Sequence, residues 1–276
     1  MNTILVPIDF SDTSENALNY AAGLANYLSA SLVLLHVDTI PVYNNEYELV
    51  TYTVKDSIEI NLELLKQKAI RLKKDNLLVG EVSYYAEAGN LETSISEFIS
   101  KKNISLIVMG ITGHDTKIGE TLFGSNSITV SRESKVPVFI IPKNYQYKKI
   151  ENIAFACEYA KDIKEQTGLH LVKSLNAMFN SNLNVLHVIP DNHLLNQTEA
   201  EADLFVEEKL ENTNHKTFIL IGDKVSTSLL DFINTHQIDL IVIEQKKHTI
   251  FHKIFYPSAT KEIAFNSPIP LLTIHS

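Results

Sequence analysis

The chain repeats one arrangement of segments, and this repeat restricts its fold more than any other feature. Short apolar segments alternate with longer amphipathic ones in the first half, and the same landmarks return in order in the second half. LLHV at Leu34–Val37 recurs as VLHV at Val185–Val188, and EFISKKNISLIVMG at Glu97–Gly110 recurs as DFINTHQIDLIVIE at Asp231–Glu244. A regular recurrence of this kind indicates two copies of one structural unit.

The short segments are predicted to be buried strands and the longer ones helices. The strands are continuous apolar runs, which is typical of parallel strands covered on both faces. Strands separated by amphipathic helices form βαβ units with right-handed crossovers. The expected strands are Thr3–Ile8, Leu32–Val37, Val82–Ala86, Leu106–Met109, Val136–Ile141 and, in the second half, Ile153–Cys157, and the first helices are Asp12–Leu28, one within Lys55–Lys73, and Leu91–Lys101. The sequence predicts an α/β protein with two tandem doubly wound, open parallel-sheet (Rossmann-like) domains.

Local signals indicate where some of these elements begin and end. Ser11 or Asp12 can cap the first helix, and Glu15 is spaced to complete a capping box from Asp12. The polar stretch Lys143–Lys149 is interpreted as the link between the halves. We therefore expect one domain at residues 1–145 and a second at residues 149–276.

Charge and composition limit the partners of the chain. The 276 residues carry a net charge of -9, which argues against nucleic acid or an anionic membrane as the main partner. No apolar run approaches the roughly 20 residues that span a bilayer, and the N-terminal stretch lacks the features of a signal peptide. Cys157 is the single cysteine, so no intramolecular disulfide can form. We expect a cytoplasmic protein.

Glycine is concentrated where a ligand would bind. In an open parallel sheet, ligands collect outside the carboxyl ends of the strands. Four of the nine glycines lie between positions 110 and 124, directly after a predicted strand. Glycine lets the backbone approach a phosphate closely, and a helix beginning near Ser125 would point free N–H groups at an anion. Asp9, at the tip of the first strand, can accept hydrogen bonds from ribose hydroxyls, so the pattern predicts a nucleotide across the strand tips.

The spacing of these glycines differs from that of two common phosphate-binding loops. Gly119 and Gly124 have G-x4-G spacing, but Ser125 and Asn126 stand where a Walker A loop requires Lys followed by Ser or Thr. No G-x-G-x-x-G follows the first strand, as it would in a dinucleotide-binding domain. Some of the glycines can equally serve only to turn the chain.

Taken together, these segments resemble the universal stress protein family. The first half contains VPIDFSDTSENAL, LLHV, LIVMG, a G-x2-G…G-S-N segment and VPVFIIP in that order, and the second half repeats them in weaker form. The resemblance implies an ATP site, with or without Mg²⁺, on a G-x2-G-x9-G-[S/T] loop. Val37 and Met109 would flank the adenine, Asp9 would hold the ribose, and the loop would hold the phosphates. The implied binding residues are Pro7, Asp9, Val37, Met109, Gly110, Gly113, Gly124, Ser125 and Asn126.

The chain departs from the family pattern in the length of this loop. Ten residues separate Gly113 from Gly124, which is one more than the pattern has. The additional residue can bulge outward at Lys117–Gly119, or it can move Gly124 and Ser125 out of register.

The resemblance also implies how the halves associate. Dimers in the family often pair through the last strand, so Val136–Ile141 and Pro270–Ile274 would meet in an intramolecular pseudo-dimer. Such pairing would protect two sheet edges. A homodimer of the whole chain and an unknown protein partner are further possibilities that the sequence leaves open.

The second half has lost the features of the nucleotide site. Glu244 stands where the first half has Gly110, and the eight residues that follow it contain no glycine. Asp9 is matched by Glu158. A carboxylate at the position of Gly110 would repel a phosphate, so we expect this half not to bind ATP in the manner of the family.

A zinc site is the alternative for the second half. His248 and His252 are spaced i, i+4 and would share one face of a helix, and Cys157 and Glu158 follow the first strand of this half. A polar surface loop and a small buried cysteine explain the same residues without a metal. We assign no metal ligand and no catalytic residue.

Three functions are consistent with the sequence. The first is a stress-response protein that binds ATP or another adenine nucleotide as a regulatory ligand. The second is an interaction or scaffold protein of the same fold without a nucleotide. The third is slow ATP hydrolysis, for which no general base is evident because Asp9 is assigned to the ribose. His36 and His187 occupy equivalent positions in both halves, which favours packing or hydrogen bonding over catalysis.

Overall fold

The computed structural model describes residues 2–39, 47–112, 125–159, 168–191, 196–245 and 257–275, and for residues 47–53, 125 and 257 the backbone alone. The chain divides into two compact units, one comprising Met1–Ile111 and Ser125–Tyr147 and the other comprising Lys148–Ser276. The association of the two units through their last strands stays a prediction.

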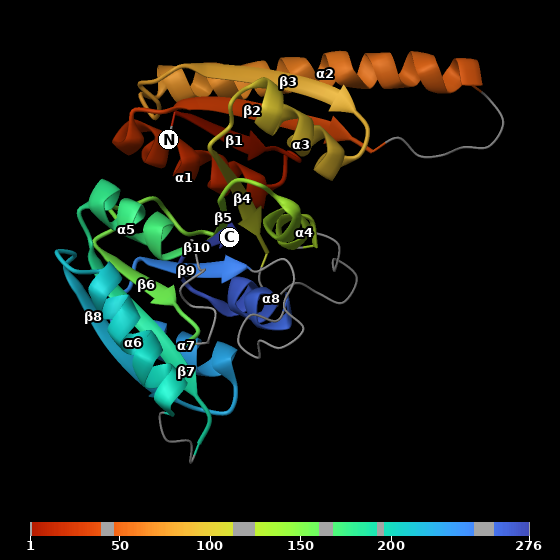
Figure 1. The fold of residues 1–276 in the computed structure, drawn as a ribbon. Coiled ribbons are helices and arrows are strands. Elements are labelled where there is room, and N and C mark those ends of the chain that lie inside the picture. The colour runs from red at the N-terminus through yellow and green to blue at the C-terminus, as the bar shows by residue number, and fades with distance from the viewer. Residues whose placement is uncertain are drawn as a thin grey trace. The chain divides into compact units, whose positions relative to one another are not determined.

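The described sheet of the first unit consists of parallel strands. The strands are β1 (Thr3–Pro7), β2 (Ser31–Asp38), β3 (Val82–Ala88), β4 (Leu106–Ile111) and β5 (Val138–Pro142). Their order is β3-β2-β1-β4-β5 (Figure 1). The chain adds β2 and β3 on one side of β1 and then returns to its other side with β4 and β5. The strand order therefore reverses between β1 and β4, which is the switch point of a doubly wound sheet.

Helices cover both faces of this sheet. They are α1 (Asp12–Leu28), α2 (Tyr47–Lys74), α3 (Leu91–Lys101) and α4 (Ser125–Glu133). Because the crossovers of parallel strands are right-handed, α1 and α2 belong on one face and α3 and α4 on the other. Contacts of α1 with α2 through Glu15, and of α3 with α4, agree with this arrangement.

Burial explains why the strands lack an alternating pattern. Ile4, Leu5 and Val6 of β1 are each 0% exposed. β2 and β4 flank this strand, and helices cover both of its faces. Both side-chain directions of the strand are therefore apolar.

The first helix begins with a side-chain cap. Ser11 is the N-cap residue, and its Oγ accepts a hydrogen bond from the N–H of Ser14 at 3.2 Å. The predicted bounds Asp12–Leu28 are confirmed. The predicted capping box from Asp12 is wrong, because with Ser11 as the cap Glu15 lies one residue beyond the box position.

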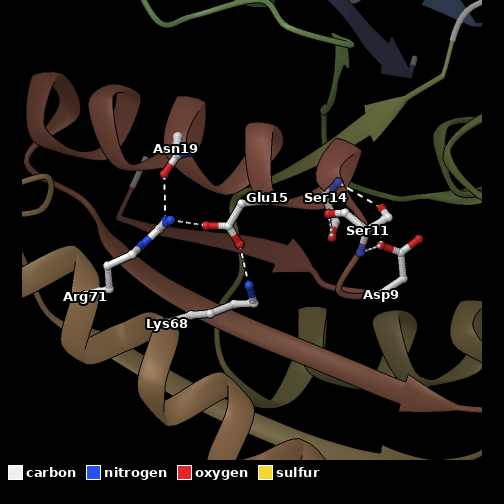
Figure 2. A network of polar contacts seen from close by, with 7 residues as sticks. All are labelled: Asp9, Ser11, Ser14, Glu15, Asn19, Lys68 and Arg71. Atoms are coloured by element: carbon white, nitrogen blue, oxygen red, sulfur yellow. Dashed lines mark hydrogen bonds and ion pairs between the residues drawn. The ribbon is translucent and has the colours of Figure 1, made fainter.

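Glu15 instead fastens α1 to α2 (Figure 2). One of its carboxylate oxygens binds Nζ of Lys68 and the other binds Nη1 of Arg71. Nη2 of Arg71 also donates a hydrogen bond to Oδ1 of Asn19 at 2.8 Å. The Glu15 side chain is 25% exposed, so water and salt screen this ion pair less than they would at an open surface. The network holds α2 beside the first turns of α1.

The predicted link between the halves is packed against α1 as far as Tyr147. Nδ2 of Asn16 donates hydrogen bonds to the carbonyl oxygens of Pro142 and Tyr145, each at 3.2 Å. The ring of Tyr147 lies so close to Gly23 that a Cβ there would overlap it. Burial raises the pKa of the Tyr147 hydroxyl to about 12. This part of the link is therefore an element of the first unit.

The second unit repeats the arrangement of the first. Its described strands, all parallel, lie in the order β10-β9-β6-β7-β8, so the order again reverses beside the first strand of the unit. The elements are β6 (Asn152–Ala156), α5 (Gly168–Phe179), β7 (Asn182–Ile189), α6 (Gln197–Lys209), β8 (His215–Ile221), α7 (Val225–Thr235), β9 (Leu240–Gln245), α8 (Pro257–Asn266) and β10 (Leu271–His275). Two doubly wound parallel sheets confirm the predicted fold class. Within the described ranges, none of the helices combines the length and the apolar character needed to cross a bilayer.

Substitution of Glu15 tests the connection between α1 and α2. We expect Glu15→Gln to lower the free energy of unfolding by about 1–2 kcal/mol, because it removes the charge that two partly buried cations share. Glu63→Gln is the matched control, since Glu63 pairs with Lys66 at an exposed site and should change stability by less than about 0.5 kcal/mol. Urea unfolding of both variants measures the difference, and equal effects would contradict this role of Glu15.

Candidate functional site

The candidate site of the first unit lies at the switch point between β1 and β4. Leu5 pairs with Ile107 across these strands. Asp9 follows β1, and Gly110 is the fifth residue of the six that form β4. This register brings the end of β1 and the end of β4 to the same edge of the sheet, where ligands of doubly wound folds bind.

Asp9 is an exposed carboxylate that the start of α1 holds in place (Figure 2). Its Oδ1 accepts hydrogen bonds from the N–H of Ser11 at 3.0 Å and from the Oγ of Ser11 at 2.6 Å. Partial burial raises the pKa of the Asp9 carboxyl, but hydrogen bonds from Ser11 and Ser14 lower it by more, so the pKa lies below its ordinary value of 3.8. Asp9 is therefore an ionised group that accepts hydrogen bonds at neutral pH.

His36 fixes the backbone from which Asp9 projects. Its Nδ1 lies 2.6 Å from the carbonyl oxygen of Ile8, and its Nε2 lies 3.0 Å from Oδ1 of Asp38. Its ring also lies against Phe10, with the ring centroids 4.7 Å apart. Phe10 has a φ of 63°, a left-handed conformation that costs a bulky residue on the order of 1–3 kcal/mol. These contacts agree with the packing and hydrogen-bonding role predicted for His36.

Asp38 extends this arrangement to α2. Its Oδ2 accepts hydrogen bonds from Oγ of Ser57 and from Nδ2 of Asn61, each at 2.7 Å. Burial raises the pKa of the Asp38 carboxyl, but the hydrogen bonds from Ser57, His36 and Asn61 outweigh it and bring the pKa below 3.8. The half-buried Val37, predicted to flank adenine, precedes this anchored residue.

Two of the predicted binding residues lie in the core, and a third packs closely against α1. Pro7 is buried at the end of β1, and Met109 is 7% exposed within β4. A Cβ on Gly110 would lie 2.5 Å from the carbonyl oxygen of Thr13, so β4 can pack against α1 only with glycine at this position. The packing of the fold accounts for Gly110 independently of any phosphate.

The predicted phosphate loop is described only at its end. Gly113 and Gly124 lie outside the described residues, and Ser125 is described as the first residue of α4 without its side chain. Asn126 lies in the first turn of α4 and lines a pocket of about 390 Å³ at the carboxyl edge of the sheet. The other residues that line this pocket are Thr39, Gly89, Asn90, Leu91 and Glu92.

Sequence reasoning missed the part of this pocket that follows β3. Asn90 caps α3, and Glu92 lies in its first turn. They follow the predicted strand Val82–Ala86 by four and six residues, at the start of the predicted helix Leu91–Lys101, so the rule that ligands bind at the carboxyl ends of strands could have identified them.

In the second unit, Glu244 takes the place of Gly110. Its side chain is 1% exposed, and Oε1 accepts a hydrogen bond from the N–H of Gly168, the first residue of α5, at 3.1 Å. A Cβ on Gly168 would overlap the Glu244 carboxylate. The second unit therefore places its own carboxylate at the N-terminus of a helix, where negative charge is favoured.

His187 of the second unit has the role of His36. Its Nδ1 lies 3.2 Å from the carbonyl oxygen of Cys157, and its ring stacks on Tyr159 with centroids 4.3 Å apart. The hydroxyl of Tyr159 donates a hydrogen bond to Oδ1 of Asp203 at 2.9 Å. The repeated contact in both units agrees with a structural role for both histidines.

The zinc alternative cannot be assembled from the described residues. His248 and His252 lie outside them, and Cys157 is 1% exposed at the end of β6. In the part of the chain that the structure describes, no group of three or more His, Cys, Asp or Glu side chains is suited to a metal ion.

The fold defines a doubly wound α/β protein. In its first unit, the switch point lies at the edge of the sheet where such folds bind ligands. The sequence profile of the universal stress protein family matches residues 1–142. A universal stress protein of Methanocaldococcus jannaschii is 30% identical over 51% of this chain and 81% of its own length. Universal stress protein YxiE of Bacillus subtilis is 33% identical over 51% of this chain and 98% of its own length.

The chain belongs to the universal stress protein family, and the resemblance noted in its sequence is confirmed. A solved structure of a universal stress protein from Archaeoglobus fulgidus matches 99% of this chain and 96% of its own, with a TM-score of 0.70 and 20% sequence identity. At that identity the match shows the fold alone. It nevertheless extends over the second unit, which the family profile does not cover.

A double-mutant cycle tests the placement of Glu244. We expect Gly168→Ala to lower the unfolding free energy by about 1–3 kcal/mol, because the added methyl group displaces the buried carboxylate. In a Glu244→Ala background the same change should carry no penalty, since the space is free and alanine favours helix over glycine by about 0.8–1.0 kcal/mol. Denaturant unfolding of the four proteins measures the coupling, and an equal loss in both backgrounds would contradict the contact.

The pH dependence of stability tests the anchoring of Asp38. Because the pKa of Asp38 is lowered in the folded state, its contribution is present above the unfolded value of about 3.8 and is lost as pH falls through the folded value. We expect Asp38→Asn to cost about 1–2 kcal/mol at pH 7. The difference from the wild type should shrink below pH 4, and a difference that stays constant down to pH 3 would argue against this account.

Proposed function

We propose that the first unit binds an adenine nucleotide, ATP in the first instance, as a regulatory ligand in a stress response. The observation that carries the proposal is the anchored carboxylate of Asp9 at the switch point of the sheet. An ionised carboxylate that cannot donate hydrogen bonds suits the two hydroxyls of a ribose. Because Ser11 and His36 hold Asp9 in position without a ligand, little free energy is lost in ordering the Asp9 side chain on binding.

The remaining contacts follow from the position of Asp9. Val37, the half-buried residue at the end of β2, and the edge of Met109 would contact the base. The start of α4 would receive the phosphates, because the free N–H groups and the dipole of a helix N-terminus favour anions. The phosphate contacts proposed are Gly110, Gly113, Gly124, Ser125 and Asn126, and Pro7 supports the end of β1.

The second unit is proposed to bind no nucleotide in this manner. A phosphate beside Glu244 would meet a buried carboxylate that already occupies the N-terminus of α5. Two like charges at such a site disfavour each other strongly. One nucleotide per chain is therefore the expected stoichiometry.

Calorimetric titration of ATP with Mg²⁺ into the full chain tests the proposal. We expect one site per chain in the wild type and a loss of affinity of roughly tenfold or more in Asp9→Asn, because hydrogen bonds to a charged acceptor contribute about 1.5–3 kcal/mol. Asp12→Asn is the matched control, since Asp12 lies three residues away in the first turn of α1 and outside the proposed site.

The alternatives give different results in the same experiment. Absence of heat, together with absence of nucleotide in an acid extract of the purified protein, would overturn the proposal and favour an interaction protein without a nucleotide. Release of inorganic phosphate during the titration would identify slow hydrolysis.

A further inference from the structure

A second pocket of the first unit lies between the start of α1 and the C-terminal part of α2. Its volume of about 320 Å³ is at the lower end of the usual range of small-molecule sites, about 300–1,000 Å³. The residues that line it are Phe10, Glu15, Leu64, Gln67, Lys68 and Arg71. None of them is among the proposed nucleotide contacts, so the proposed function leaves this pocket without a role.

The charged side chains that line this pocket carry one positive charge in excess. Lys68 and Arg71 share the single carboxylate of Glu15 (Figure 2). The side chains of Lys68 and Glu15 are only 22% and 25% exposed, so water compensates the excess charge less than it would at an open surface. Because partly buried charges are favourable only with a counter-charge, this lining favours an additional anion.

Arg71 also has a hydrogen-bond donor that the described protein does not use. Its Nη1 pairs with Glu15, and its Nη2 donates a hydrogen bond to Oδ1 of Asn19 at 2.8 Å. Its Nε is buried, and among the described residues no hydrogen bond engages it. A buried N–H group without an acceptor is unfavourable, so the guanidinium lacks one acceptor that an oxygen of a bound anion would supply.

Two apolar side chains in the lining restrict the class of anion. Leu64 lies one turn before Lys68 on α2 and is 39% exposed. The ring of Phe10 lies against that of His36, with centroids 4.7 Å apart, and Nζ of Lys68 lies 5.8 Å from the centroid of the Phe10 ring. An inorganic anion would leave these apolar groups in water, whereas an organic acid with an apolar body would cover them.

We propose that this pocket binds a small organic carboxylate, with the carboxylate on Lys68 and Arg71 and the apolar body against Phe10 and Leu64. The ligand supplies the second counter-charge for two cations that otherwise share Glu15. Its hydrogen bonds to the ammonium and guanidinium groups are charge-assisted, which makes them stronger than those of a neutral ligand. The inference is independent of the proposed nucleotide site, because the two sets of contacts have no residue in common.

Fluorine NMR of 4-fluorobenzoate, titrated with the full chain, measures this binding. We expect a Kd of about 1 mM or tighter, which is reasonable for a ligand of about ten non-hydrogen atoms. 4-Fluorobenzyl alcohol keeps the ring but lacks the charge, and it should bind about tenfold more weakly or less. Saturating ATP should leave the affinity for 4-fluorobenzoate unchanged within about twofold, because the proposed sites are separate.

Two charge variants should change the affinity for 4-fluorobenzoate in opposite directions. Lys68→Gln removes the excess positive charge and should weaken binding about fivefold or more. Glu15→Gln adds to the excess and should strengthen binding about threefold or more, a gain that a loss of structure would not produce. Lys66→Gln and Glu63→Gln are the matched controls, because these residues pair with each other on the exposed side of α2, and both should stay within about twofold of the wild type.

A third variant changes the apolar wall and leaves the ion pairs intact. Leu64→Ser should weaken binding of 4-fluorobenzoate about threefold or more, because it removes apolar surface that the ring would cover. Leu62→Ser is the matched control, since Leu62 is also 39% exposed on α2 and does not line the pocket. Equal effects of the two substitutions would argue against contact between Leu64 and the ligand.

The contrary outcomes are equally defined. No binding of 4-fluorobenzoate to the wild type at about 10 mM would overturn the site. Binding that ATP abolishes, or that neither Lys68→Gln nor Glu15→Gln alters, would place the anion elsewhere on the chain and overturn the proposal. Equal affinity for the acid and the alcohol would overturn the role of the charged groups. Failure of ATP to bind would overturn the proposed function alone and leave this site standing.

Discussion

The pairing of β1 with β2 on one side and with β4 on the other is the constraint on which the first unit depends. It buries β1 from Ile4 to Pro7 and makes the strand order reverse at its edge. The chain then has to leave the apolar layers, and Asp9, two residues after β1, is the first charged residue to do so. His36 holds the last carbonyl before it, at Ile8, and the start of α1 holds its carboxylate. The position of Asp9 thus follows from the topology of the sheet, and its orientation follows from local hydrogen bonds.

The second unit obeys the same constraint with different residues. β6 is flanked by β7 and β9, and His187 contacts the carbonyl of Cys157 as His36 contacts that of Ile8. The units differ at the end of the strand that lies across the switch point, which is β4 in the first unit and β9 in the second. Gly110 lets β4 pack directly on α1, whereas Glu244 fills the equivalent place with a buried carboxylate that binds the start of α5. The same topology therefore brings the strand end and the helix together by close backbone packing in one unit and through a buried carboxylate in the other.

Much of this could be predicted from the sequence because it depends on neighbours along the chain. The bounds of α1 and α3 match the prediction, since apolar periodicity and cap residues are local signals. The ion pair of Glu15 with Lys68 was not predictable in this way, because its partners lie 53 residues apart and meet only when α1 and α2 share a face. The tight packing of Gly110 on Thr13 and the burial of Glu244 depend in the same manner on which elements become neighbours. Sequence reasoning took Gly110 for a phosphate contact alone, while the fold requires glycine there in any case.

The contrast between the units also bears on how a ligand can act in this protein. In the second unit, Glu244 satisfies the helix N-terminus permanently, so an external anion finds a carboxylate already in place. In the first unit, by contrast, the carboxylate near the switch point is that of Asp9, which is exposed. A ligand changes an equilibrium only through a difference in its affinity for the states concerned. Under the proposed function only the first unit offers such a difference, because Asp9 would accept hydrogen bonds from the ribose, whereas Glu244 of the second unit already occupies the N-terminus of α5. Under the same proposal, the repeat pairs one unit that binds a ligand at this edge with one whose equivalent position is occupied by its own carboxylate.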